Sequence, residues 1–213
     1  MDRPADQPLR CLAINCTLKA SGPSSTQLLL DQVLGELRGL GVRCSSLRAV
    51  TFDIRPGVTS DEGEGDAWPA VREELLGADI LLLGTPIWLG NPSSVCRRVL
   101  ERCDAFLGET DDAGRMVTFG KVAGVVVTGN EDGAHNVVAQ LYQGLADAGF
   151  SIPTNAATYW VGEAMGSTDY RELDEQPDAV ASMTRMMATN LAHLARLLRA
   201  HPYPAPGETA VAG

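Results

Sequence analysis

The chain has 213 residues, of which 45% are hydrophobic and 21% are charged, a composition typical of one folded globular domain rather than a disordered segment. Its 17 basic and 27 acidic side chains give a formal charge of −10, which argues against binding nucleic acid or anionic lipid through a positive surface. The longest apolar stretches, such as 80–83 and 122–127, are far shorter than the roughly 20 residues that a membrane-spanning helix needs, so we expect no membrane insertion.

Hydrophobic periodicity predicts a strand, a helix and a second strand at the start of the chain. Residues 9–15 have the pattern of a short buried strand, and the apolar residues of 25–40 recur every three or four positions, as on one face of a helix. Ser24 and Gln27 have the spacing of a capping box at the start of that helix. Residues 42–50 predict the second strand.

A polar and acidic run, 59–66, separates this strand from a short predicted helix at 67–76. Its carboxylates alternate along the chain, which suggests a calcium site. The run lacks the twelfth-position glutamate and the flanking helices of an EF-hand, so we interpret it as a solvated loop.

Two continuous apolar runs, 80–83 and 122–128, predict strands that are covered on both faces, as in a parallel sheet. Asn91 and Pro92 form an N-cap and first-turn pair, and they predict that the next helix begins there. Further apolar patterns predict two more helices and, between them, a last strand or extended segment; these lie at 134–148, 178–200 and 150–161.

Five strands thus alternate with five helices through short connections, which predicts parallel βαβ units wound on both faces of one sheet. We expect one domain over 1–213, with residues 1–8 and 202–213 as loose tails.

The five cysteines are odd in number and contain no CxxC motif, and residues 1–8 contain no apolar signal-peptide core. We therefore expect a cytoplasmic protein without disulfides, a structural metal site or an iron–sulfur cluster. Four of the cysteines are predicted to be buried structural thiols, and Cys16 lies in a loop of functional interest. The other four are Cys11, Cys44, Cys96 and Cys103.

Three loops follow predicted strands, where ligands of open parallel sheets bind. Residues 15–26 are rich in hydroxyls and precede a helix N-terminus, a combination that binds phosphate, although Ser24 and Ser25 could simply cap the helix. Residues 84–92 place Trp88 and two aliphatic side chains in a loop; they form either a flat apolar surface for a planar ligand or a core edge.

The third loop, 128–133, has two glycines that allow close backbone approach and an asparagine that both donates and accepts hydrogen bonds. Its alternative interpretation is an ordinary turn with Asp132 as the helix N-cap. The chain contains neither GxxxxGK[ST] nor GxGxxG after a strand, which argues against a P-loop nucleotidase and a dinucleotide-binding Rossmann fold. The three loops would thus provide a phosphate-binding site, a flat apolar surface and a polar amide edge. Together these match the three parts of flavin mononucleotide (FMN).

The loop 15–26, TPIWLGNPSS (85–94) and GKVAGVVVTGNEDGAH (120–135) are similar to motifs of the NADPH-dependent FMN reductase family. The resemblance covers about residues 9–200. It implies a flavodoxin-like three-layer α/β/α sandwich with a five-stranded parallel sheet in the order 2-1-3-4-5.

The resemblance also implies the FMN-binding residues. The phosphate would be held by Thr17, Lys19, Ser24, Ser25 and Thr26. The isoalloxazine ring would be lined by Thr85, Pro86, Ile87, Trp88, Leu89 and Gly90. The pyrimidine edge would meet Gly129, Asn130, Glu131, Asp132 and Gly133. The chain has Thr-Leu-Lys at 17–19 where the family often has Ser-Pro-Arg or Ser-Leu-Arg, and lysine is a poorer bidentate phosphate ligand than arginine.

The implied function is an FMN-dependent NAD(P)H oxidoreductase that passes electrons from NADPH or NADH to a quinone, an azo compound or free flavin. No side chain is assigned as a general acid or base, and His135 is interpreted as a solvated helix-start residue. Tyr159 and Trp160 are expected to help cover the flavin in a homodimer or homotetramer. Two alternatives stay open: a flavodoxin-type FMN electron carrier without a nicotinamide site, and an interaction domain without flavin.

Overall fold

A single sheet organises the computed structural model, which describes residues 7–205 and 207. Five parallel strands lie in the order β2-β1-β3-β5-β6, which is 2-1-3-4-5 when only these five are counted and confirms the expected topology. A two-residue strand, β4, pairs antiparallel with the end of β3. The strands are β1 (Arg10–Asn15), β2 (Arg43–Arg48), β3 (Ile80–Trp88), β4 (Asn91–Pro92), β5 (Val122–Gly129) and β6 (Ala157–Val161).

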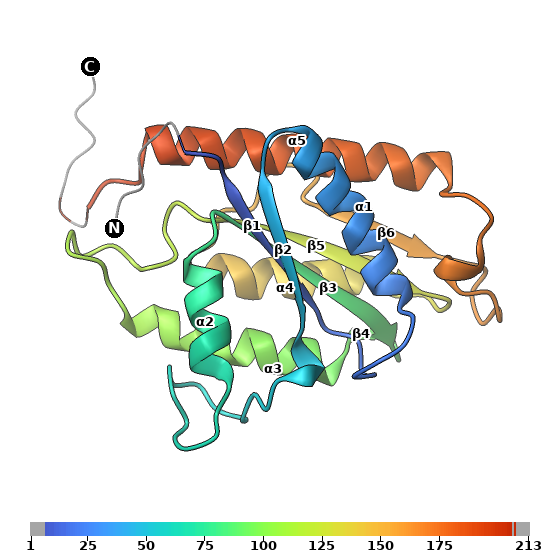
Figure 1. Cartoon of the computed structure of the whole chain (residues 1–213), viewed down its shortest axis with the longest axis horizontal. Coiled ribbons are helices and arrows are strands. Elements are labelled where there is room, and N and C mark those ends of the chain that lie inside the picture. The colour runs from blue at the N-terminus through green and yellow to red at the C-terminus, as the bar shows by residue number, and fades with distance from the viewer. Residues whose placement is uncertain (1–6, 206, 208–213) are drawn as a thin grey trace.

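Helices cover both faces of the sheet, so the three-layer α/β/α sandwich is confirmed (Figure 1). One face packs against α1 and α5, and the other against α2, α3 and α4. The helices are α1 (Ser25–Gly39), α2 (Trp68–Leu76), α3 (Ser94–Arg102), α4 (Ala134–Asp147) and α5 (Asp178–Ala200). Three 3₁₀ turns follow β2, α3 and β6; they are η1 (Ala49–Thr51), η2 (Cys103–Gly108) and η3 (Tyr170–Glu172).

The central strand β3 shows why the apolar runs are unbroken. Ile80 and Leu82 point into the layer of α1 and α5, whereas Leu81 and Leu83 point into the opposite layer. All four are at most 2% exposed. A strand buried on both faces needs aliphatic side chains at every position, which is the pattern observed.

Two N-cap assignments made from the sequence are wrong, one of them an alternative interpretation. Asn91 is not the N-cap of α3, because Asn91 and Pro92 pair with Trp88 and Ile87 as β4, and the Ser93 hydroxyl caps α3 instead by accepting from the Cys96 N–H. Asp132 does not cap α4, whose N-cap is Gly133. Of the expected tails, residues 1–6, 206 and 208–213 lie outside the described residues.

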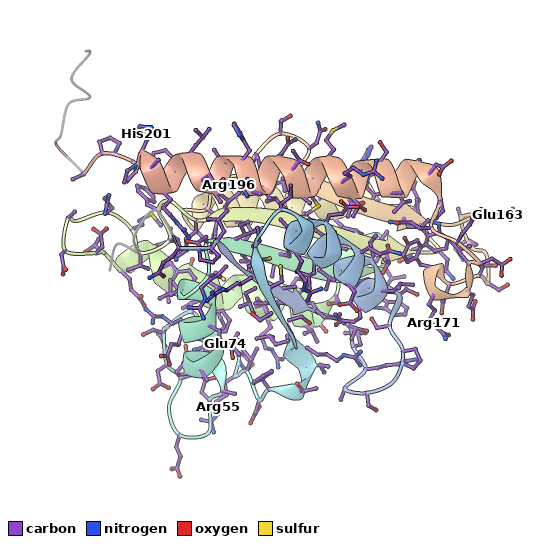
Figure 2. The ribbon with its side chains drawn as sticks, turned by 45° about the horizontal axis from the view of Figure 1, so that its top comes forward. Arg55, Glu74, Glu163, Arg171, Arg196 and His201 are labelled. Atoms are coloured by element: carbon purple, nitrogen blue, oxygen red, sulfur yellow. The ribbon has the colours of Figure 1, made fainter. Side chains whose placement is uncertain are left out.

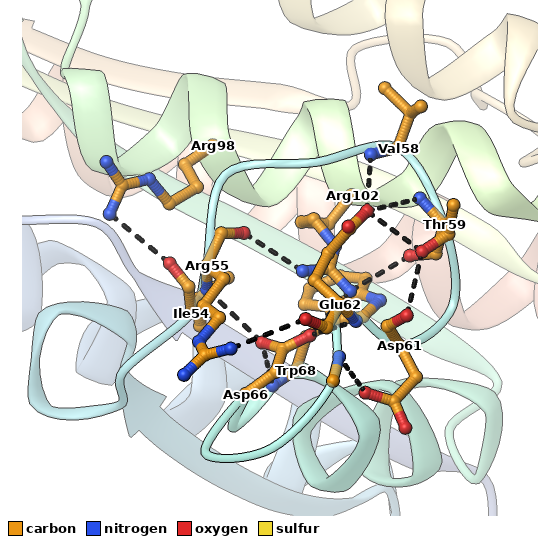
Figure 3. A network of polar contacts seen from close by, with 11 residues as sticks. Ile54, Arg55, Val58, Thr59, Asp61, Glu62, Asp66, Trp68, Arg98 and Arg102 are labelled. Carbon is orange, nitrogen blue, oxygen red and sulfur yellow. Dashed lines mark hydrogen bonds and ion pairs between the residues drawn. The ribbon is translucent and has the colours of Figure 1, made fainter.

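The interpretation of 59–66 as a solvated acidic loop holds for most of its residues, which are exposed, but it is wrong for Asp66 (Figure 3). The Asp66 carboxylate forms a 2.8 Å ion pair with Arg102 of α3, and both side chains are fully buried. Arg102 also donates to the carbonyl oxygens of Arg55 and Thr59, each at 2.9 Å, and its guanidinium lies 5.6 Å from the Trp68 ring centroid. Residues 55–68 are therefore folded around one buried arginine.

The sequence analysis also expected no membrane insertion, no structural metal site and buried structural thiols. Within the described part of the chain, no helix is long and apolar enough to cross a membrane. The same residues contain no group of three or more His, Cys, Asp or Glu side chains placed to hold a metal ion. Cys11, Cys96 and Cys103 are buried as predicted, whereas Cys44 is only half-buried. Cys16, in the loop of functional interest, is also buried.

Candidate functional site

A cleft of about 460 Å³ lies beyond the carboxyl ends of β1, β3 and β5, within the roughly 300–1,000 Å³ of small-molecule sites. It brings together eleven of the sixteen residues that were expected to bind a ligand. They are Thr17, Lys19, Ser24, Ser25, Thr26, Pro86, Ile87, Trp88, Gly129, Asn130 and Glu131.

The loop between β1 and α1 is held by Asn15 and Arg48, neither of which lines the cleft. The buried Asn15 side chain accepts from the Thr17 N–H at 3.0 Å. Arg48, at the end of β2, donates to the carbonyl oxygens of Lys19 and Gly22 at 3.2 and 3.1 Å. The Thr17, Lys19 and Gly22 contacts use main-chain groups, so they leave the Thr17 hydroxyl and the Lys19 ammonium for a ligand.

Helix capping and ligand binding share the start of α1. The Ser24 hydroxyl accepts from the Gln27 N–H at 3.2 Å and so caps the helix, while Ser24 and Ser25 also line the cleft. Thr26 is almost fully buried, and its hydroxyl lies 2.8 Å from that of Thr128 on β5. The capping interpretation of Ser24 is confirmed, and it is compatible with a ligand at the helix N-terminus.

Aromatic side chains also line the cleft. Trp88 does not pack into the core: 54% of its surface is exposed, at the carboxyl end of β3. Trp160 on β6 also lines the cleft, and its ring centroid lies 5.4 Å from that of Tyr170. The cleft therefore has flat apolar surfaces next to a hydroxyl-rich end.

Five of the expected ligand residues do not line the cleft. Thr85 is buried, and its hydroxyl accepts from the Ser93 N–H at 3.0 Å. Gly90 and Gly133 support the wall from behind: a Cβ on Gly133 would lie 2.7 Å from the Gly90 Cα. Leu89 is 90% exposed. Asp132 accepts from the adjacent N–H of Gly133.

A segment that the sequence did not single out, 162–177, forms one wall of the cleft through Asp169, Tyr170 and Arg171. It is tied to both sides of the site. The Asn130 amide donates to the Gly166 carbonyl oxygen at 2.8 Å, and the Arg171 N–H donates to the Ser25 hydroxyl at 3.4 Å. The segment has no helix or strand periodicity that would have marked it. The other lining residues without a predicted role are Leu18, Pro23 and Thr128.

Tyr170 anchors this segment. Its side chain is 2% exposed, and its hydroxyl donates to the Gln32 side chain of α1 at 2.7 Å. Burial raises the pKa of Tyr170, so the phenol stays protonated near neutral pH and keeps donating to Gln32. The residues on either side of Tyr170 are therefore held in place at the mouth of the cleft.

A larger hollow of about 630 Å³ lies at the opposite end of the sheet, where Asp79, Lys121 and Tyr203 are among its lining residues. None of the expected ligand residues is there. Because parallel sheets bind ligands at the carboxyl ends of their strands, the smaller cleft is the candidate site.

A family model for NADPH-dependent FMN reductases matches residues 9–166. A flavin-processing protein is also similar: 8-demethyl-8-aminoriboflavin-5'-phosphate synthase of Streptomyces davaonensis is 32% identical over 206 residues, which cover 92% of this chain and 80% of that protein. A divalent metal cation transporter, MntH, of Mycobacterium bovis is 38% identical over 200 residues, or 90% of this chain. The matched chain spans only 29% of the transporter's length.

Two solved structures place the fold. The structure of RosB with bound 8-demethyl-8-formylriboflavin-5'-phosphate has a TM-score of 0.84 and 32% identity, covering 92% of this chain and 82% of RosB. A flavodoxin of Streptococcus pneumoniae has a TM-score of 0.56 and 17% identity, covering 87% of this chain and 98% of the flavodoxin. The flavodoxin likeness establishes the fold alone.

Proposed function

The chain belongs to the NADPH-dependent FMN reductase family, and on that premise we propose that it is an FMN-dependent NAD(P)H oxidoreductase with its flavin in the cleft beyond β1, β3 and β5. The observation that carries this proposal is the make-up of the cleft. Hydroxyls and a lysine lie at one end, aromatic rings lie beside them, and the polar Asn130–Glu131 edge closes the site. These groups match the phosphate, the ring system and the pyrimidine edge of FMN.

We assign the phosphate to the loop before α1, where Thr17, Lys19, Ser24 and Ser25 would hold it. The aligned N–H groups at the start of a helix favour an anion, and the first turn of α1 contains no acidic residue to oppose one. Thr26 would support this end from the floor of the cleft through its contact with Thr128.

The ring system would lie against Pro86, Ile87 and Trp88, with Trp160 nearby, and its pyrimidine edge would meet Gly129, Asn130 and Glu131. For the five expected residues outside the cleft, we propose that they support the loops after β3 and β5 rather than contact the flavin. The Gly90 N–H donates to a Glu131 carboxylate oxygen at 3.4 Å, and Asn136 donates to the Gly90 carbonyl oxygen at 2.8 Å, so the two loops position each other.

Bound FMN would accept hydride from NADPH or NADH and pass electrons to a small acceptor such as a quinone, an azo compound or free flavin. The chain's own residues bind and orient, and no side chain is assigned a proton-transfer role. The spectrum of the purified protein after FMN addition, followed by NADPH under anaerobic conditions, tests the proposal. We expect bound flavin that NADPH bleaches. Bound flavin that neither NADPH nor NADH bleaches would favour an electron carrier, and absence of binding would favour an interaction domain.

A second candidate function is that a riboflavin 5'-phosphate is the substrate rather than a lasting cofactor. It is favoured by the likeness to RosB, whose structure holds such a compound. The mass of the flavin recovered after turnover separates the two functions: an unchanged mass supports the oxidoreductase, and an altered ring substituent supports flavin modification.

Replacing Trp88 with alanine is expected to weaken FMN binding about 3- to 10-fold, because the stacking of an aromatic pair contributes roughly 0.5–1.5 kcal/mol. The free energy of unfolding should change by less than about 0.5 kcal/mol, since the side chain is largely exposed. Flavin fluorescence titration and urea denaturation measure the two effects. Phe119→Ala, an aromatic deletion at the other hollow, should leave FMN affinity unchanged. Normal FMN affinity in Trp88→Ala would contradict the ring assignment.

We also propose that the protein assembles as a homodimer or homotetramer through the exposed apolar residues Leu89 and Met165. Leu89 and Met165 are 90% and 87% exposed, and both have left-handed backbone conformations, with φ of 52° and 63°. Such exposure next to a binding cleft is typical of an interaction surface. Light scattering should show that the double substitution Leu89→Asp and Met165→Asp yields monomers, whereas Leu107→Asp on η2 does not. An unchanged mass in the double variant would contradict this interface.

A further inference from the structure

We propose that Arg171 is a ligand of the flavin phosphate and, with Lys19, determines the preference of the cleft for a phosphorylated flavin. This inference rests on the proposed function. Arg171 follows Ser25 by 146 positions in the sequence, yet its backbone N–H contacts the Ser25 hydroxyl. The inference therefore adds a binding residue from a distant part of the chain.

The cleft itself has few positive charges. Among its described lining residues, the cations are Lys19 and Arg171, and the carboxylates are Glu131 and Asp169. A phosphate ester carries nearly two negative charges at neutral pH, and the chain carries a formal charge of −10. One ammonium group therefore leaves the phosphate only partly neutralised, and a second cation at the same end would stabilise it.

Arg171 lies at the correct end of the cleft. Its N–H donates to the hydroxyl of Ser25, the first residue of α1, so its backbone lies beside the helix N-terminus assigned to the phosphate. Figure 2 shows Arg171 at the end of the molecule where α1 begins. The buried Tyr170 and its bond to Gln32 hold this backbone in place without using the arginine side chain.

The guanidinium is available for a ligand. Its side chain is 41% exposed, and its partners Asp169 and Glu172 lie 3.3 and 3.5 Å away, equally exposed. Exposed ion pairs of this kind contribute little, so a phosphate can replace them. The two carboxylates also have partners of their own: each accepts from the other residue's backbone N–H in a capping box.

Arg48 also contacts the loop between β1 and α1, but its guanidinium already has partners there. Arg48 donates to the carbonyl oxygens of Lys19 and Gly22 behind the loop and does not line the cleft. A guanidinium also offers two parallel N–H donors, which suit two phosphate oxygens better than a single ammonium does. The geometry thus selects Arg171 for bidentate binding.

The test compares FMN with riboflavin, which has the same ring system without the phosphate. For Arg171→Gln, we expect FMN binding to weaken about 10- to 100-fold, the loss of a charged hydrogen bond, and riboflavin binding to stay unchanged. Arg185→Gln removes the same charge from the exposed face of α5, where Arg185 pairs with Glu36 at 3.9 Å, and should change neither affinity. Calorimetry or fluorescence titration measures both ligands.

Each outcome decides between hypotheses. Unchanged riboflavin affinity shows that Arg171→Gln is folded, and Arg171→Met, which retains the aliphatic stem, is used if it is not. An unchanged ratio of FMN to riboflavin affinity in the folded variant would overturn the role of Arg171. An unaltered chain that binds both flavins equally would overturn phosphate recognition but not the ring site, and one that binds neither would overturn the proposed function itself.

Discussion

Replacing Arg102 with leucine is expected to lower the free energy of unfolding by about 3–5 kcal/mol, the loss that follows when one partner of a buried ion pair is removed. Arg102 is fully buried and holds three groups at once: the Asp66 carboxylate and the carbonyl oxygens of Arg55 and Thr59. Without it, the Asp66 charge is left in the interior, and two carbonyl oxygens lose their donor.

Urea denaturation measures this loss, and Arg98→Leu serves as the matched control. Arg98 lies one turn earlier on α3, is exposed, and donates to the Ile54 carbonyl oxygen at 3.2 Å. Its replacement should cost about 1 kcal/mol or less. Adding Asp66→Leu to Arg102→Leu should recover part of the loss, because no unpaired charge then remains. A cost for Arg102→Leu as small as that for Arg98→Leu would show that residues 55–68 do not depend on the buried pair.

The same pair gives the stability a defined pH dependence. Burial alone raises the pKa of Asp66, but hydrogen bonds from the backbone of Glu62, Trp68 and Arg55 and from Arg102 outweigh it, and the pKa falls to about 2. The unfolded chain has an aspartate pKa of about 3.9. The stabilisation is therefore fully present above about pH 4 and is lost as the pH falls towards 2. Comparing Asp66→Asn with the unaltered chain at both ends of this range should show a smaller acid-induced loss in the variant.

Replacing Gly133 with alanine is expected to destabilise the protein by about 2–4 kcal/mol, from backbone strain and overpacking together. Gly133 has φ of 121°, and a Cβ there would lie 2.7 Å from the Gly90 Cα and 3.1 Å from its carbonyl oxygen. Both neighbours are backbone atoms, which cannot move aside as a side chain tip can. The loops after β3 and β5 must separate, so FMN affinity should fall as well.

Gly41→Ala separates the two contributions to this effect. Gly41 also has a left-handed backbone, with φ of 81°, but a Cβ there would meet nothing within 4 Å. Its replacement should cost only the strain, about 1–2 kcal/mol, and should leave FMN binding unchanged. Equal losses of stability in the two variants would contradict the close approach of the loops.

Much of the fold was predictable from the sequence, because helices such as α5 and strands such as β5 have long and regular apolar patterns. The end of β3 was not. The apolar run 80–83 predicts a strand that ends before a loop at 84–92, yet β3 continues through Gly84 to Trp88. The glycine is required by packing instead: a Cβ on Gly84 would lie 2.5 Å from the Leu30 side chain of α1. Close packing and a turn both favour glycine. A glycine in a single sequence therefore does not show which of the two causes is at work.

The candidate site was predictable where it lies at strand ends and not where it depends on distant partners. The loops at 15–26 and 128–133 follow clear strands, so their place at one sheet edge follows from topology. Arg171 joins them only through contacts such as that with Ser25. Asp66 likewise reads as solvated until Arg102, 36 positions later, is placed beside it. Pairings over such separations leave no local pattern.

The two hydrogen bonds from Arg48 connect the loop between β1 and α1 to β2, the outermost strand on that side of the sheet. These bonds restrain the loop without a ligand, so binding of a flavin phosphate at the proposed site would not require the loop to fold first. Amide hydrogens of β2 should in turn exchange more slowly with solvent once the loop is occupied, although no atom of that strand lines the cleft.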